Sequence, residues 1–300
     1  MKLKNIYLYL TNKLYRFNIN TSRGKYDHLS DEDFLKLKFK IVFGRELDLV
    51  NPKTYNEKLQ WIKLYDRKPR YTQMVDKFEA KKYVESLIGS QYIIPTLGVW
   101  DKFEDIDFNV LPDEFVLKCT HDSGGLIVCK NKNKLNLNKA KSSVEKSLKH
   151  NYYLAGREWP YKDVRPRIIV EKYMEDSITG DLKDYKFYTF NGKVKYVMIN
   201  TDRGKGKTKA DYFDKEFNWL DFTWGYPNSK TKIAKPKNFE KMIILSEILA
   251  KETYELRVDF YECNGKIYFG ELTFFDGGGF TKFEPELWDL KFGSDLTLPL

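Results

Sequence analysis

The sequence is poor in the residues that build covalent or metal-bound frameworks. It has 300 residues but only three cysteines and three histidines. Cys119, Cys129 and Cys263 are odd in number and include no Cys-x-x-Cys pair, which argues against a disulfide framework and a zinc site. Cys119 and Cys129 lie in apolar runs. We therefore expect buried free thiols.

Long hydrophobic runs are also missing. No stretch approaches the roughly 20 apolar residues that span a bilayer. The N-terminal segment 1–20 is basic, its apolar run covers only residues 6–10, and no small-residue cleavage site follows, so it does not resemble a signal peptide. We expect a cytoplasmic protein, with peripheral contact at the inner face of the membrane left open. Such a contact would use the basic residues Lys2, Lys4, Lys13 and Arg16.

The charge is unbalanced toward the basic side, with a formal net charge of +9. Positive charge favours polyanions, namely nucleic acid, an anionic membrane surface or phosphorylated small molecules. Because the lysines are spread along the chain and not clustered, we favour phosphate-bearing ligands over a nucleic-acid groove. A soluble basic surface explains most of them equally well. Oligomeric state is not accessible from these features.

The first 70 residues have the pattern of helices. Ser30 is placed to cap a helix, with Asp33 three residues later, and Thr54 is placed likewise, with Glu57 at the capping-box position. A third helix is expected over 76–87, ending near Gly89.

Antiparallel hairpins dominate the rest of the chain. Strands are expected over 115–119 with 126–129, 184–190 with 193–200, and 256–261 with 266–273, the last two pairs around Asn-Gly turns. A further strand is expected over 167–174 and helices over 138–151 and 239–251. This order predicts an α+β fold with a small inserted lid. The expected divisions are a helical N-terminal region 1–75, a pre-lid segment 76–114, a lid 115–168 and a C-terminal subdomain 169–300.

Two segments carry weak signals for phosphate binding. Lys118 lies on the opposite strand face from its neighbours and precedes a turn containing Gly124 and Gly125, whose backbone N–H groups could approach an anion. Asp184 and Lys186 share a strand face, so Lys186 is a second candidate phosphate ligand. A solvated lysine beside a loose turn and a surface ion pair explain these two features as well.

The segment 167–176 ends an apolar strand in acidic residues. Glu171 could accept a hydrogen bond from an adenine amino group, and the backbone of Tyr173 and Met174 could read the ring edge. Glu175 or Asp176 could bind ribose hydroxyls. A strand leaving into solvent with ordinary surface charges is the competing explanation.

The last hairpin has the most specific pattern. Arg257 and Asp259 lie on one strand and Glu271 and Thr273 on the next. Magnesium bound to a nucleotide takes one or two carboxylates from the protein. We predict a three-residue turn with a bulge at Gly265, which would pair Asp259 with Phe269 and bring all four side chains to one face.

Together these ordered motifs resemble the ATP-grasp enzymes, and the wider sequence resembles their TupA-like branch, linked to teichuronopeptide and other surface-polysaccharide synthesis. The resemblance covers roughly residues 30–290. It rests on the segments 51–61, 76–77, 115–118, 167–171, 184–187, 257–259 and 270–274.

The resemblance implies a role for each matching residue. ATP and Mg²⁺ are the implied cofactors. Nucleotide binding is assigned to Lys77, Lys118, the loop residues His121, Ser123, Gly124 and Gly125, the hinge residues Glu171, Tyr173, Met174 and Glu175, and Asp184. Metal binding is assigned to Asp259, Glu271 and Thr273. Thr273 stands where many ATP-grasp enzymes have asparagine, so one or two magnesium ions are both open.

The implied activity is that of a carboxylate–amine ligase working through an acyl phosphate. Arg257 and Lys186 are the expected catalytic residues. The expected partners are a uronic-acid-type carboxylate on a glycan precursor and an amino acid or other amine. The loop 276–280 is a candidate for the acceptor side, and the basic loop 203–207 for contact with an anionic glycan. No general base is obvious, since a loop histidine such as His121 is usually incidental.

Two other functions remain open at this stage. An ATP-grasp kinase that phosphorylates a sugar or alcohol would release ADP without needing an amine. A non-enzymatic polyanion- or membrane-binding protein would bind in a salt-sensitive way and turn over no ATP.

Overall fold

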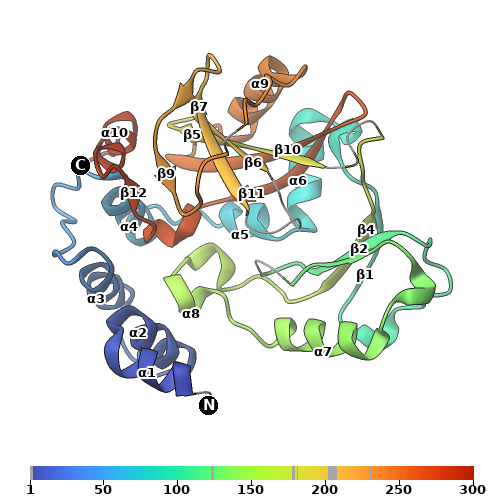
Figure 1. Ribbon diagram of the computed structural model, residues 1–300, viewed down its shortest axis with the longest axis horizontal. Helices are drawn as coiled ribbons and strands as arrows, with labels where there is room; N and C mark the ends of the chain where they lie inside the picture. The colour runs from blue at the N-terminus through green and yellow to red at the C-terminus, as the bar shows by residue number, and fades with distance from the viewer. Residues whose placement is uncertain (1–2, 123–124, 178–179, 181, 202–207, 230) are drawn as a thin grey trace.

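The computed structural model describes residues 3–122, 125–177, 180, 182–201, 208–229 and 231–300 (Figure 1). Ser123, Gly124 and the basic loop 203–207 lie outside the described residues. Within these ranges, no helix is both long and apolar enough to cross a bilayer. All three cysteines are free and buried, as predicted.

The N-terminal region is helical, as predicted. It contains α1 (Leu3–Thr11), α2 (Lys13–Ser22), α3 (Asp31–Phe43) and α4 (Tyr55–Tyr65). The Ser30 side chain caps α3, and Thr54 with Glu57 forms the full capping box of α4. Helices α1 to α3 gather at one end of the molecule, whereas α4 packs beside the C-terminal α10 (Leu287–Asp295) (Figure 1).

The helix expected over 76–87 begins later and follows a break. The chain forms α5 (Arg70–Val75) and α6 (Glu79–Ile88), which ends at Gly89 as predicted. Asp76 lies between the two helices, and its carboxylate accepts hydrogen bonds from the backbone N–H groups of Phe78 and Glu79. The break also lets the Lys77 backbone N–H donate to Thr120 O at 3.0 Å, beside the end of a neighbouring strand.

A four-stranded antiparallel sheet forms the smaller layer, in the order β1 (Thr96–Trp100), β4 (Ile168–Lys172), β2 (Phe115–Cys119) and β3 (Ile127–Cys129). Helix α7 (Leu137–Leu148) packs against it, and the short α8 (Tyr153–Gly156) follows (Figure 1). Because β1 and β4 pair in this sheet, the expected boundaries at 114/115 and 168/169 are wrong for it. The sheet combines strands from segments that are far apart in the sequence, and these strands share one buried core.

A six-stranded antiparallel sheet forms the larger layer. Its order is β11 (Lys266–Thr273), β10 (Glu255–Cys263), β5 (Lys183–Phe190), β6 (Lys193–Thr201), β7 (Lys209–Asp214) and β8 (Trp219–Leu220). Helix α9 (Phe239–Leu249) packs against one face of this sheet, and β9 (Thr223–Trp224) pairs with β12 (Phe283–Glu284). An aromatic core joins this layer to the helices α4 and α10, with Tyr196 stacked on Phe292 at 3.8 Å. The whole is the mixed helix and antiparallel-sheet fold predicted from the sequence.

Candidate active site

The β10–β11 hairpin brings the two predicted metal acids face to face. Asp259 pairs directly with Glu271 and Arg257 with Thr273, so all four side chains lie on one face of the sheet. The shared face was predicted, but the predicted register was wrong. Asn264 and Gly265 both have positive φ, 51° and 73°, and form a two-residue turn without a bulge.

The bulge lies instead inside strand β11, at Gly270. The pairing shifts between Phe260↔Phe269 and Asp259↔Glu271, which leaves Gly270 as the extra residue. A Cβ atom at this position would come within 3.0 Å of the Tyr261 ring and 3.1 Å of Asp259 O. Glycine therefore avoids close contacts where the strand bends to turn Glu271 onto the face of Asp259.

Arg257 holds three carboxylates at once. Its Nε and Nη2 donate to Asp259 at 2.7 and 2.9 Å, Nη2 also donates to Glu271 Oε1 at 2.6 Å, and Nη1 donates to Asp276 Oδ1 at 2.8 Å. Burial alone would lower the pKa of Arg257, but Asp259, Asp276 and Glu271 raise it well above its usual value. The guanidinium is thus a fixed cation at the centre of the site.

Lys186 is the second cation on this face, because β5 pairs it directly with Asp259. Its ammonium group bonds to Asp259 Oδ2 and lies 2.8 Å from Asp184 Oδ2. All three side chains are at least 95 % buried. The structure therefore brings the predicted residues Asp184 and Lys186 into the acid cluster.

The two paired acids differ in proton affinity. Burial raises the pKa of Asp259, against the opposing effect of Arg257 and Lys186. Burial acts on Glu271 in the same direction, but Arg257, Lys186, Lys77 and Lys118 together hold its pKa below the usual range. Glu271 is also the more open of the two, with its side chain 39 % exposed against 2 % for Asp259. Glu271 is therefore an ionised, reachable carboxylate.

Lys77 and Lys118 approach from the side of the small sheet. Lys77 donates to the backbone oxygen of Asp122, and Lys118 Nζ lies 2.5 Å from Glu171 Oε2. Burial lowers the pKa of Lys77, while Glu271 raises it and Lys118 lowers it, so these groups act on one another through space. Lys77 therefore lines the cavity at the acids, and Lys118 lies close enough to lower the pKa of Glu271 while it pairs with Glu171.

Glu171 has partners that its sequence context did not reveal. Its other oxygen pairs with Lys81 from α6, so both carboxylate oxygens are engaged by lysines. Burial would raise the pKa of Glu171, but Lys118 and Lys81 hold it below its usual value. The side chain ties α6, β2 and β4 together, and its contact with adenine remains a prediction.

The remaining hinge residues lie farther out. Glu175 Oε2 accepts hydrogen bonds from Tyr173 and from Lys130, the latter at 2.6 Å, and the Lys130 ammonium lies over the Tyr173 ring. Met174 between them is half-buried. Their roles in binding the adenine and ribose stay predictions.

The loop after β2 is only partly described. His121 is buried and turned toward α7, with Nε2 3.1 Å from Ser147 O, so it does not line the cavities at the acids. Gly125 lies against Asp122, where an added Cβ atom would come within 2.8 Å of the carboxylate. Ser123 and Gly124, expected to contact phosphate, lie outside the described residues.

Two cavities, each of about 390 Å³, meet at the acid cluster and share Arg257, Glu271, Asp276 and Gly277. We call the one reached from Lys77 the first cavity; its wall includes Lys38, Lys77, Asp122, Glu158 and Thr273. The second cavity extends over β6 and β7, and its wall includes Lys186, Met198, Asn200, Tyr212, Trp224 and Tyr226. Ligands entering from two sides would therefore meet at Arg257.

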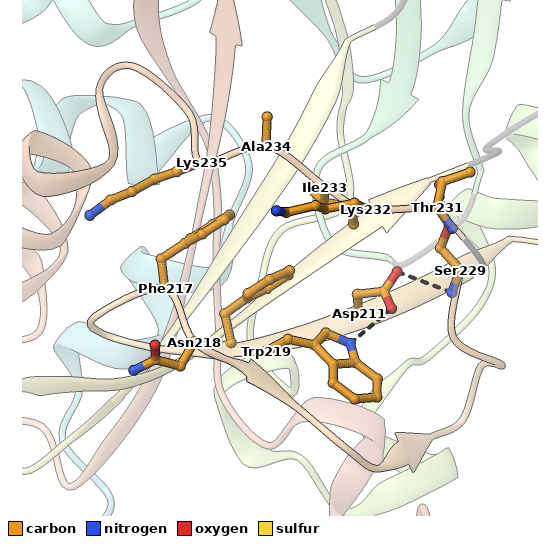
Figure 2. Close-up of a pocket in the computed structure, with 11 residues that line it drawn as sticks. Asp211, Phe217, Asn218, Trp219, Ser229, Thr231, Lys232, Ile233, Ala234 and Lys235 are labelled. Carbon is orange, nitrogen blue, oxygen red and sulfur yellow. Dashed lines mark hydrogen bonds between the residues drawn. The ribbon is translucent and has the colours of Figure 1, made fainter.

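A third cavity of about 660 Å³ lies on the opposite face of the large sheet (Figure 2). Asp211 and Phe213 point into it, whereas Tyr212 between them faces the second cavity. Asp211 accepts hydrogen bonds from Trp219 Nε1 at 3.3 Å and Ser229 N at 3.0 Å (Figure 2). Among the predicted site residues that the structure describes, none lines it.

The glycine loop 276–279 lines both cavities of the site, and side chains of helix α4 donate hydrogen bonds to it. Gly277, Gly278 and Gly279 all have positive φ. Lys63 Nζ donates to Gly278 O at 2.6 Å, Gly156 O at 2.9 Å and Gln60 Oε1 at 3.0 Å, and Gln60 Nε2 donates to Gly279 O at 2.8 Å. Sequence reasoning missed Lys63 and Gln60, although both lie in or next to the segment 51–61 that carried part of the family resemblance.

The oxygen atoms on this face suit a magnesium ion that is also bound to a nucleotide better than a metal ion held by protein ligands alone. Among the described residues, no group of three or more His, Cys, Asp or Glu side chains is arranged to hold a metal ion. Two carboxylates on one face with a hydroxyl nearby, Thr273 Oγ1 at 3.2 Å from Glu271 Oε1, leave the other positions to phosphate and water. Asp259, Glu271 and Thr273 would therefore hold the ion.

Residues 57–297 match the family described as TupA-like ATPgrasp. The chain belongs to the TupA-like ATP-grasp family. ATP-grasp enzymes use ATP with Mg²⁺. The family assignment agrees with the order of lysines and acids described above.

Solved structures similar to this TupA-like chain are distant from it. N5-carboxyaminoimidazole synthetase from Staphylococcus aureus, complexed with ADP, is 14 % identical over 67 % of this chain and 43 % of its own, with a TM-score of 0.39. D-alanine–D-alanine ligase from Bacillus anthracis, complexed with ATP, is 16 % identical over 67 % and 55 %, with a TM-score of 0.39. The ligase of the same name from Helicobacter pylori is 14 % identical over 82 % and 70 %, with a TM-score of 0.42.

The TupA-like chain spans about half the length of the first of these structures that it matches. No curated protein matches its sequence.

Proposed function

We propose that this protein is an ATP-dependent carboxylate–amine ligase. The observation that carries the proposal is the direct pairing of Asp259 with Glu271 beside Arg257, at the point where two cavities meet. A ligase must hold a nucleotide and two further substrates around one reacting carboxylate. Two cavities that share one cationic wall provide room for them.

The proposed roles of the site residues are to position the substrates and to stabilise the charges of the reaction. Bound Mg–ATP supplies the phosphoryl group that activates the substrate carboxylate as an acyl phosphate. Lys77, Lys118 and Lys186 would neutralise the triphosphate, and Asp259 and Glu271 would hold the metal. Such fixed charges stabilise the transition state without reorganising during the reaction.

Arg257 stabilises the phosphoryl group in transfer. Its Nη1 is anchored on Asp276, which is separate from the metal acids and is itself held by the Tyr188 hydroxyl at 2.5 Å. This anchor would hold the guanidinium in place if Asp259 and Glu271 bound a metal ion. A guanidinium can also donate to phosphate oxygens, which would suit this role for Arg257.

For the carboxylate substrate we propose a uronic-acid-type sugar of a surface-polysaccharide precursor. The second cavity supports this class, because it is lined by Tyr212, Trp224 and Tyr226, whose faces suit a sugar ring. Asn200 lines it too, and its buried Oδ1 has no hydrogen-bond partner within the part of the chain that the structure describes. A sugar hydroxyl would supply the missing donor.

The proposal is tested by following ADP release with Mg²⁺, ATP, glucuronic acid precursors and a panel of amino acids. We expect turnover that needs both a carboxylate and an amine and that is lost in Glu271→Gln. The matched control is Glu262→Gln, which should keep full activity. Glu262 lies in the same hairpin, but it accepts a hydrogen bond from Asn238 on the opposite face of the sheet from Glu271. ADP release that is independent of the amine would instead favour a kinase.

A further inference from the structure

Glu158 is a buried acid in the first cavity that the proposed mechanism has not used. It lies between α8 and the 3-10 turn Trp159–Tyr161, and only 7 % of its surface is exposed. Its carboxylate lines the cavity together with Arg257, Glu271 and Asp276. No sequence motif indicated a function for Glu158, because a glutamate between an arginine and a tryptophan at a turn is not distinctive.

The Glu158 carboxylate is without a partner of its own. Within the described residues it makes neither a hydrogen bond nor an ion pair. The two nearby cations make their hydrogen bonds to other groups: Lys38 donates to Ala155 O at 2.8 Å, and Lys63 donates to Gly278 O, Gly156 O and Gln60 Oε1. They act on Glu158 only through space. Buried carboxylates are costly and are normally paired, so one left open toward a cavity suggests a ligand with a donor.

The position of this carboxylate is fixed against the glycine loop. A Cβ atom added at Gly278 would lie 3.3 Å from Glu158 Oε1, and one added at Gly156 would lie 2.7 Å from it. Gly278 O is in turn held by Lys63. Glu158 therefore lies against the loop that follows β11, and it lines the same cavity as Glu271 and Thr273.

We propose that Glu158 binds the ammonium group of the amine substrate and is the general base for its attack. The proposal rests on the proposed ligase function and adds the residue that selects and activates the second substrate. The amine then occupies the Glu158 side of the first cavity, the nucleotide phosphates occupy its Lys77 and Thr273 side, and the second cavity holds the carboxylate substrate.

The reaction balances with the groups already named. Glu158 takes one proton from the ammonium group, and the freed lone pair forms the C–N bond to the acyl carbon. The C–O bond to phosphate breaks and its electron pair leaves with the phosphate. The second nitrogen proton passes to the departing phosphate, and the Glu158 proton returns to water through the cavity.

The electrostatic surroundings support a base that works near neutral pH. Burial raises the pKa of Glu158, Lys63 and Lys38 lower it, and Asp276 raises it. Tyr161 is the other titratable group that interacts with it, and burial raises the pKa of that phenol well above its usual value. A carboxylate with raised proton affinity takes a proton from an ammonium group more readily than an exposed one.

The test compares two nucleophiles in the full-length enzyme. Hydroxylamine is uncharged near neutral pH and traps acyl phosphates without needing a base. A mixture of the twenty common amino acids supplies ammonium nucleophiles. With ATP, Mg²⁺ and glucuronic acid, we expect Glu158→Gln to lower amide formation by about 100-fold or more while hydroxamate formation is unchanged. Glu145→Gln, an exposed acid on α7, is the control and should behave as wild type.

Two further readouts separate a base from a structural residue. The rate of amide formation by the wild-type enzyme should rise with pH as Glu158 loses its proton. This pH-dependent rise should be missing in Glu158→Gln. The variant should also unfold at the same temperature or higher, because it removes an unpaired buried charge. Equal losses with both nucleophiles, or no loss with either, would overturn the inference. Absence of hydroxamate with wild type would instead overturn the ligase function on which it rests.

Discussion

At the scale of single residues, the site depends on one guanidinium. Arg257 makes four hydrogen bonds to three carboxylates that arrive from β10, β11 and the glycine loop. A lysine has the charge but not the planar set of donors needed to reach all three. The geometry of the donors, more than the charge, sets the positions of the acids.

We therefore expect Arg257→Lys to reduce turnover by about 10²- to 10³-fold, since it removes directed donors at the reacting phosphate. Nucleotide binding should persist, because Lys77, Lys118 and Lys186 remain. Steady-state kinetics and nucleotide titration measure the two quantities. The matched control is Arg70→Lys, which should leave turnover unchanged. Arg70 also donates through two guanidinium nitrogens, but to Glu252 on the surface. Wild-type rates in Arg257→Lys would contradict the role assigned to the fork.

Glu255 predicts a pH dependence of stability. It is 1 % exposed, accepts hydrogen bonds from the Tyr55 hydroxyl and from Phe275 N, and burial raises its pKa from 4.5 to about 8. The folded protein thus keeps a proton that the unfolded chain releases. The contribution of this group to stability is complete below pH 4.5 and is lost as pH rises toward 8.

Relative to Glu255→Gln, the wild-type free energy of unfolding should fall by roughly 1 kcal/mol per pH unit across this window. Urea unfolding of both proteins at several pH values measures the difference. Parallel pH profiles would show that Glu255 ionises in the folded protein as it does in the unfolded chain.

At the scale of elements, ion pairs inside the small sheet differ from those on its surface. Glu171 links Lys81 and Lys118 within the buried junction of α6, β2 and β4, whereas Glu104 pairs with Lys141 in solvent. We expect Glu171→Gln to lower the free energy of unfolding by about 3 kcal/mol, because two lysines lose their buried partner. Glu104→Gln should change it by less than about 1 kcal/mol. Equal effects in chemical denaturation would contradict the buried role of Glu171.

The glycine loop offers a second comparison between matched positions. Gly278 and Gly265 have similar φ values, 64° and 73°, but a Cβ atom at Gly278 would meet Glu158 and one at Gly265 would meet nothing within 4 Å. Each change to alanine should cost about 1 kcal/mol of stability through backbone strain. Only Gly278→Ala should also reduce amine-dependent turnover, as measured beside thermal unfolding. A normal rate in Gly278→Ala would place the amine elsewhere.

These elements show what local sequence determines. The caps at Ser30 and Thr54 and the Asn191-Gly192 turn follow from short-range chemistry, and these were predicted. The hairpin at Asn264-Gly265 was also predicted, but with a three-residue turn where the structure has two residues. The bulge at Gly270 was misplaced and the break at Asp76 was missed, because each depends on a contact with another element of the fold. Gly270 bends against Tyr261, and the residue after Asp76 bonds to Thr120.

At the scale of the whole molecule, the site is assembled from regions far apart in the chain. The sequence order of lysines and acids predicted that Lys77, Lys118, Lys186 and Glu271 belong together, and the structure brings them together. None of the predicted site residues lies in the helical region before Lys77, yet α4 supplies Lys63 and Gln60 to the glycine loop. Glu158 could not be predicted, because its role depends on the cavity around it.

The fold also accounts for the balance of charge around the site. The small sheet carries Lys118, the chain before α6 carries Lys77, and the large sheet carries the acids with Arg257 and Lys186. We expect Mg–ATP to stabilise the whole protein, by about 2.7 kcal/mol at a hundredfold excess over its dissociation constant. Thermal unfolding with and without Mg–ATP measures this. The shift should shrink in Lys118→Ala, and an unchanged shift would remove Lys118 from the nucleotide site.

The most direct test of the central claim follows an oxygen atom. If the carboxylate is activated as an acyl phosphate at the Asp259–Glu271 site, a substrate carboxylate labelled with oxygen-18 must pass one labelled oxygen to the released phosphate. Mass spectrometry of that phosphate, with glucuronic acid and the amino-acid panel, measures the transfer. The account predicts one labelled oxygen in each phosphate from wild type and no phosphate from Glu271→Gln. Turnover that releases only unlabelled phosphate would contradict it.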